Sequence, residues 1–237
     1  MEISLDVSFV RGVLAEERQR ATEEIAGVGV VKAYQSSRER HDARIAAAPD
    51  VSTLACRAGC TWCCHFSVDV RAVEVFSILD FVQRNLSQDE KERIFSEIRT
   101  NAAVLKGLDE WERMGRNIKC PFLSNGRCSI YEARPQTCRN YHATDVAGCQ
   151  QSYEHPDDLE IDPEFAPLVY QAGGAHVDAF TKAMREAGYD TNVYELNCAL
   201  DTALSEPEAR TRFEAKRAPF KKLPGDDVPG EFEDLDD

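Results

Sequence analysis

Apolar residues recur at helical spacing through the first fifty positions, with one interruption. The apolar stripe of the first predicted helix comprises Val7, Val10, Leu14 and Ile25. Gly27 and Gly29 break the pattern, which resumes over residues 30–48 and ends before Pro49. The pattern predicts a helical hairpin that leads into the segment after it.

Two more amphipathic helices are predicted before residue 110. The first takes Ser67 or Asp69 as its N-cap, and its apolar positions are Val70, Val73, Val75, Phe76, Leu79 and Val82. The second begins after Ser87, which with Glu90 has the sequence of a capping box, and it ends at Gly107. We expect both helices to pack into the core.

The segment 119–142 has a different pattern. Two short apolar pieces flank Asn125-Gly126, a pair of residues that favours a tight turn between antiparallel strands. We call this expected two-stranded unit the knuckle. Pro135 then suits the first turn of a short helix that carries Cys138.

The helical pattern returns after residue 160. Asp162 is the expected cap and Pro163 the expected first turn of a helix that runs to about Ala187. Two shorter helices are predicted over 191–205 and 206–220.

Together these patterns predict a mainly α fold: a helical domain around a cysteine-rich loop region, with one small two-stranded knuckle. We divide the chain into an N-terminal helical segment, a cysteine-cluster domain, C-terminal helices that pack on that domain, and an acidic tail, with the bounds 1–50, 51–150, 151–218 and 219–237. The tail lacks apolar periodicity, so we expect it to be disordered.

Composition narrows the function classes. The 237 residues are 43% hydrophobic and carry a formal net charge of −14, which suits a globular chain but not one that neutralises phosphates or an anionic membrane surface. No apolar stretch approaches membrane-spanning length, and the first residues do not resemble a secretory signal. We therefore expect a cytoplasmic protein with neither nucleic-acid nor membrane partners.

A cytoplasmic location makes the nine cysteines more favourable as metal ligands or catalytic thiols than as disulfides. Disulfides are rare in reducing compartments, and an odd count does not close into pairs. Eight of the nine fall into two groups: Cys56, Cys60, Cys63 and Cys64, then Cys120, Cys128, Cys138 and Cys149. Closely spaced thiolates can approach one soft cation to about 2.3 Å or hold an iron–sulfur cluster, so all eight are candidate metal ligands.

Two arrangements of these ligands are open. Each group could hold its own metal, or the knuckle could close over the loop 56–64 so that the groups share ligands. We favour sharing, because a separate site would leave the wide spacing of Cys128, Cys138 and Cys149 unexplained. The adjacent pair Cys63-Cys64 could face one metal or two, since neighbouring side chains in an extended segment point apart.

The remaining candidates have weaker cases. His65 and His142 lie next to cysteines or close to them, and we expect each to support the site or face the surface rather than ligate. Cys198 suits a buried helical position, where a thiol acts as a small apolar side chain.

The order of rare residues resembles a known family. The run "CRAGCTWCC" and the later block "CPFLSNGRCSIYEARPQTCRNY" are similar to the YkgJ-type cysteine-cluster family, a zinc- or iron-chelating domain, over roughly residues 52–150. The resemblance implies that Cys56, Cys60, Cys63, Cys64, Cys120, Cys128 and Cys138 are metal ligands. We add Cys149 to the candidate ligands because of the number of cysteines and because it lies close to the other three of its group in the sequence. Thr61-Trp62 stands where family members often have glycine, which affects the loop geometry and not the ligands.

The leading hypothesis is a metal-binding protein that holds a [4Fe–4S]-type cluster or Zn²⁺ in a structural, redox or metal-handling role. The alternative is a cluster-dependent enzyme, since flagellin lysine methylases related to this family carry a similar cluster. A metal-delivery module would need a protein partner, for which Tyr131, Tyr141, Arg134 and Arg139 could form a docking layer. Catalytic residues are not assigned, and no nucleotide-binding loop stands out.

Overall fold

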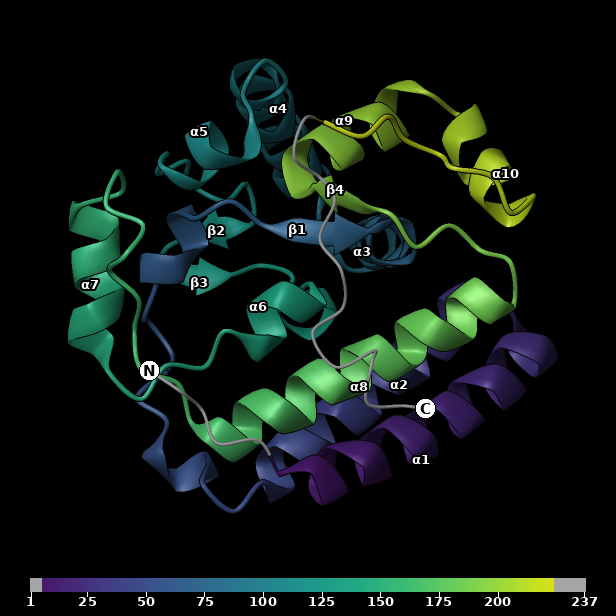
Figure 1. Cartoon of the computed structure of the whole chain (residues 1–237). Coiled ribbons are helices and arrows are strands. Elements are labelled where there is room, and N and C mark those ends of the chain that lie inside the picture. The colour runs from purple at the N-terminus through teal and green to yellow at the C-terminus, as the bar shows by residue number, and fades with distance from the viewer. Residues whose placement is uncertain (1–5, 224–237) are drawn as a thin grey trace.

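Three long helices form one layer of the protein, whose computed structural model describes residues 6–223. α1 (Val7–Val28) and α2 (Val30–Ala47) make a hairpin, and α8 (Pro167–Glu186) packs along both of them (Figure 1). The side chain of Asp6 caps α1 by accepting a hydrogen bond from the backbone N–H of Phe9. Gly29 joins the hairpin at φ 85°, a conformation that favours glycine.

A second layer lies across the molecule from these helices (Figure 1). It contains α3 (Ala72–Asn85), α4 (Gln88–Leu105), α9 (Leu196–Ser205) and α10 (Glu208–Glu214). Two short antiparallel strands, β1 (Asp69–Arg71) and β4 (Val193–Glu195), pair with Val70 opposite Tyr194. One cluster of buried apolar residues extends from Ala21 on α1 to Phe220 beyond α10, and it joins the two layers.

Short elements fill one side of the molecule between the layers (Figure 1). They are the 3-10 helices η1 (Val51–Thr53), η2 (Trp62–His65) and η3 (Tyr131–Ala133), the helices α5 (Glu110–Met114), α6 (Gln136–Asn140) and α7 (Val146–Glu154), and the strands β2 (Leu123–Ser124) and β3 (Arg127–Cys128). No helix within residues 6–223 is long and apolar enough to cross a membrane.

The mainly α fold and the knuckle are confirmed, but three predicted boundaries are wrong. The helix expected to start at Ser67 or Asp69 begins at Ala72, because residues 69–71 pair with β4. β4 itself replaces the first part of the helix predicted over 191–205. The helix predicted from Pro163 begins at Pro167, since Phe165 bridges to Ala143 and keeps the preceding backbone extended.

Other expectations have mixed outcomes. The capping box of Ser87 and Glu90 forms as predicted and opens α4. The sequence pattern did not indicate α5 and α7. Residues 224–237 of the acidic tail lie outside the described residues.

Candidate metal centre

The knuckle is an antiparallel hairpin that fixes two thiols. Asn125 and Gly126 adopt φ 50° and 71° in a two-residue turn, and Leu123 pairs with Cys128 across the strands. Cys120 lies just before the hairpin, and its carbonyl accepts a 3.0 Å hydrogen bond from the backbone N–H of Leu123. The two cysteines are therefore positioned by eight or so residues of local backbone.

Backbone amides point at both of these sulfurs. Phe122, two residues after Cys120, hydrogen-bonds that thiol and lowers its pKa, and Ile130 does the same for Cys128. An N–H that donates to sulfur favours the thiolate, the form that binds metal. Burial acts in the opposite sense and raises both pKa values.

Cys138 comes to the knuckle on α6, a helix of five residues whose ends are held by other elements. The buried carboxylate of Glu74 accepts a 2.9 Å hydrogen bond from the backbone N–H of Gln136 and so caps α6 from another helix. Arg139 is buried and forms an ion pair with Asp42 of α2. Tertiary contacts thus order a helix too short to be stable alone.

The adjacent pair Cys63 and Cys64 lies on η2, and the backbone there pairs with residues 118–120, just before the knuckle. The N–H of Cys120 donates to the carbonyl of Cys64 at 2.8 Å, and the N–H of Ile118 donates to the carbonyl of His65 at 2.9 Å. The knuckle therefore closes over the first cysteine run, as the sharing arrangement requires.

Four thiols from three segments interact electrostatically with one another. We call Cys64, Cys120, Cys128 and Cys138 the inner thiols. Burial raises the pKa of Cys120, and ionised Cys138, Cys128 and Cys64 raise it further. Burial raises the pKa of Cys138 to about 12, with contributions from ionised Cys128 and Cys64. Each inner thiolate thus opposes the ionisation of the others, a conflict that a bound cation would relieve.

The other thiols gather beside this set. We call Cys56, Cys60 and Cys149 the outer thiols. Cys56 Sγ lies 3.9 Å from the carbonyl oxygens of Tyr141 and Ala143, and the Ala55 N–H donates to Ala143 at 2.9 Å. Burial raises the pKa of Cys149 to about 11, and Cys56 and Cys60 add to that shift.

Cys63 connects the two sets. Its thiol donates to the sulfur of Cys64, which raises the pKa of Cys63 and lowers that of Cys64 to about 7. Cys138 of the inner set and Cys56 of the outer set also raise the pKa of Cys63. Both sets therefore combine ligand candidates from both halves of the sequence.

Arg134 is the positive charge common to these thiols. Its guanidinium lowers the pKa of four thiols: Cys56, Cys64, Cys128 and Cys138. The guanidinium carbon also lies 4.1 Å from the centre of the Tyr131 ring. This charge moderates the negative potential of a thiolate-rich site.

The chemistry of these thiols fits zinc or iron, although their sulfur atoms do not form a complete coordination shell. All nine cysteines of the chain are free thiols, and eight of them belong to the two sets or to Cys63. Among residues 6–223, no three Cys, His, Asp or Glu side chains converge closely enough to hold an ion without movement. Soft thiolates without competing oxygen ligands are what zinc and iron–sulfur clusters select.

Comparison with known proteins agrees with this chemistry. Residues 55–162 match the CxxCxxCC family, described as a "putative zinc- or iron-chelating domain". We refer to this matched segment as the CxxCxxCC domain. No curated protein and no solved structure matches the chain.

Both candidate histidines of the CxxCxxCC domain interact with groups other than thiols. His65 packs edge-on against Tyr153, with the ring centres 5.0 Å apart, and its Nδ1 faces the carbonyl of Thr61 at 3.2 Å. Burial lowers the pKa of His142 to about 4, and the charged groups around it are Arg134, His41, Asp42 and Arg139. Outside the domain, Cys198 is buried on α9, as expected.

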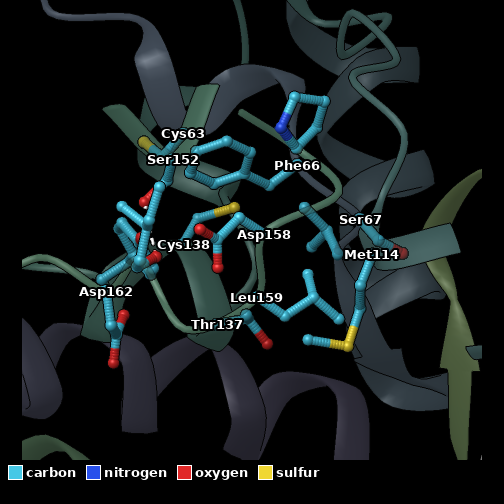
Figure 2. Close-up of a pocket in the computed structure, with 14 residues that line it drawn as sticks. Cys63, Phe66, Ser67, Met114, Thr137, Cys138, Ser152, Asp158, Leu159 and Asp162 are labelled. Atoms are coloured by element: carbon cyan, nitrogen blue, oxygen red, sulfur yellow. Dashed lines mark hydrogen bonds between the residues drawn. The ribbon is translucent and has the colours of Figure 1, made fainter. Parts of the chain in front are cut away.

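An apolar cavity of about 260 Å³ opens beside the inner thiols, and no sequence pattern indicated it. Cys63 and Cys138 form part of its wall (Figure 2). The sequence also did not identify Glu74 as a cap for α6. The one sequence signal for this role was the position of Glu74, a glutamate on the apolar face of a predicted helix.

Proposed function

We propose that the CxxCxxCC domain binds metal through two sets of thiolates. The inner thiols form one four-coordinate site for Zn²⁺ or a [4Fe–4S] cluster, and the outer thiols with Cys63 form a second. The observation that carries this proposal is the electrostatic interaction among Cys64, Cys120, Cys128 and Cys138, which lie on η2, on the hairpin segment 120–128 and on α6.

The first role of the metal is structural. The segments that carry the thiols, 55–65 and 118–149, contain only short helices and are held together by short backbone pairings, so a metal bound by both segments would cross-link them. For such a region, metal-binding energy becomes folding energy.

One observation favours a second role, that of a cluster-dependent enzyme. The cavity lined by Cys63 and Cys138 brings an apolar ligand to the edge of the centre. Pockets of this kind, with a few polar groups and perturbed pKa values, are typical of active sites. A methyl-transferring enzyme similar to protein lysine methylases is the form of this alternative that the sequence resemblance implies.

The test is purification of the full chain without oxygen, followed by metal and acid-labile sulfide analysis and an absorption spectrum. Broad absorption near 400 nm with sulfide identifies a cluster, and a colourless protein with bound zinc identifies zinc sites. Cys64→Ser should remove one site and Cys56→Ser the other, while Cys198→Ser retains both. A folded protein that contains no metal contradicts the proposal.

A further inference from the structure

The cavity beside the inner thiols has an apolar interior. Its walls come from η2 and residues 66–68 after it, from α6 and Tyr141, and from α7 and residues 156–162 after it. Met114 of α5 closes one side (Figure 2). Its apolar side chains are Phe66, Val68, Met114, Leu159 and Ile161. A volume of about 260 Å³ equals roughly nine water-sized groups at about 30 Å³ each, enough for a short alkyl or cycloalkyl body.

Two hydroxyl groups of the lining donate their protons to backbone carbonyls. Ser152 Oγ lies 2.8 Å from the carbonyl of Ile161, and Thr137 Oγ1 donates to the carbonyl of Asp69 at 2.7 Å. Each therefore offers only lone pairs to a ligand. These two oxygens favour a ligand that donates hydrogen bonds.

The charged groups of the lining all have the same sign. Asp158 and Asp162 carry carboxylates, and no Lys, Arg or His is among the lining residues. Asp158 Oδ1 accepts one 3.2 Å hydrogen bond from the Glu160 N–H, which leaves its other oxygen available to a ligand. A divalent ion bound by four thiolates beside the wall would add to this potential, because the four thiolates outweigh its charge.

We propose that this cavity binds an organic ammonium ion, a protonated amine carried on an apolar body. The apolar body of the ligand occupies the apolar interior. Its ammonium group donates to Asp158, to Asp162 and to the hydroxyl oxygens of Thr137 and Ser152. An anionic ligand would meet two carboxylates and no positively charged side chain in the lining. The inference deepens the proposed function, because it names the ligand class of a site beside the thiols.

The experiment is calorimetric titration of the metal-loaded full chain with three probes of equal length: n-hexylammonium, 1-hexanol and hexanoate. We expect n-hexylammonium to bind at least tenfold more tightly than 1-hexanol, and hexanoate to give no binding. Asp158→Asn and Asp162→Asn should each weaken n-hexylammonium binding by about threefold to tenfold, the range for a partly exposed charge pair.

Asp157→Asn is the matched control, since it removes an adjacent exposed carboxylate that does not line the cavity, and it should retain the wild-type affinity. Circular dichroism and metal content verify that the variants are folded. Equal affinity for hexanoate, or unchanged n-hexylammonium affinity in both lining variants, overturns the inference.

A further arm uses a short peptide with one lysine, which distinguishes a polypeptide source of the amine from a small molecule. Tighter binding than n-hexylammonium assigns the site to a polypeptide, and weaker binding assigns it to a free amine. If the protein contains metal but binds none of the probes, the inference about the cavity is wrong and the proposed function stands. If the protein folds without metal and binds n-hexylammonium, the proposed function is wrong and the inference stands.

Discussion

Asn140 Oδ1 lies 2.6 Å from His41 Nε2, so the buried imidazole on α2 donates to the amide two residues after Cys138. The neighbouring Arg139 pairs with Asp42, one residue further along α2. The N-terminal hairpin lies outside the CxxCxxCC match at 55–162, yet it holds the helix that carries Cys138. Metal binding by the domain is therefore coupled to the stability of the helical layer.

Gly173→Ala should disturb this connection. A Cβ at Gly173 on α8 would overlap Asn140 Oδ1, and it would also come 3.3 Å from His41 Nε2. Overpacking of this kind costs about 1–3 kcal/mol. We expect the free energy of unfolding in urea to fall by that amount and the metal centre that contains Cys138 to lose metal faster to a chelator.

Gly12→Ala is the control for that substitution. Gly12 also lies within a helix, α1, but nothing surrounds its added Cβ within 4 Å. Replacement of a helical glycine by alanine at an open site should stabilise the protein by about 0.5–1 kcal/mol. If both variants change stability in the same direction, the close approach of Asn140 to α8 does not matter.

Arg134→Gln should weaken metal binding without unfolding the protein. The variant removes the positive charge that lowers the pKa of Cys64 and Cys128, and loss of a supporting group beside metal ligands typically costs tenfold to 100-fold in affinity. Competition with a coloured chelator measures this change. Arg134→Lys should recover part of the affinity, because it restores charge but not the planar group over Tyr131.

Arg127→Gln provides the comparison, since it removes a charge from the exposed strand of the same hairpin. It should leave the metal affinity within about twofold of wild type, as expected for an exposed charge in screening solvent. Equal loss in the Arg127 and Arg134 variants would show that only net charge matters.

The sequence predicted features that depend on local residues. Asn125-Gly126 specifies its turn regardless of the rest of the fold, and Ser87 with Glu90 caps a helix through contacts three residues apart. The thiol positions followed from residue type and spacing. Their gathering into inner and outer sets did not, because it depends on which segments meet in space.

Several of the missed features depend on tertiary contacts. Residues 69–71 form a strand only because Val193–Glu195 arrives to pair with them. Pro163 would suit a first helical turn, but the bridge between Ala143 and Phe165 holds that backbone extended until Pro167. No spacing rule relates Glu74 to Gln136, which lie 62 positions apart.

Metal removal should loosen the knuckle before the helical layer. The β2–β3 hairpin has two residues per strand and is too short to persist alone, whereas α1 and α8 share a buried core. We expect rapid hydrogen exchange at the amides of Cys120 and Ser129 after chelation, with slow exchange retained in α8. Stability should fall by about 3 kcal/mol or more, as for loss of a ligand present at 100 times its Kd.

The same comparison in the Cys198→Ser variant separates metal loss from general thiol effects. Cys198 is buried on α9, away from both thiol sets, so its replacement should leave the chelator response unchanged. Uniform loss of protection across α8 and the knuckle would contradict a local role for the metal.

His176 should make the protein less stable as the pH falls below about 6.5. The imidazole is fully buried on α8, its Nε2 lies 2.9 Å from Ser37 Oγ, and burial lowers its pKa well below the usual value. Glu17 lies 3.6 Å away but is already paired with Arg40, and the nearby His41, Arg44 and Arg40 lower the pKa of His176 further. The native state therefore keeps this histidine neutral.

The sign of the pH effect follows from where the proton binds. Unfolded histidine has a pKa near 6.5, so between that pH and the lower native pKa the unfolded chain of this protein binds more protons. The contribution of His176 is complete above about pH 6.5 and is lost by up to roughly 1.4 kcal/mol per pH unit as the pH falls. Urea unfolding between pH 7.5 and 5 should show a shallower slope for His176→Gln than for wild type. His155→Gln, at an exposed position, should keep the wild-type slope, and identical slopes in all three proteins would contradict the assignment.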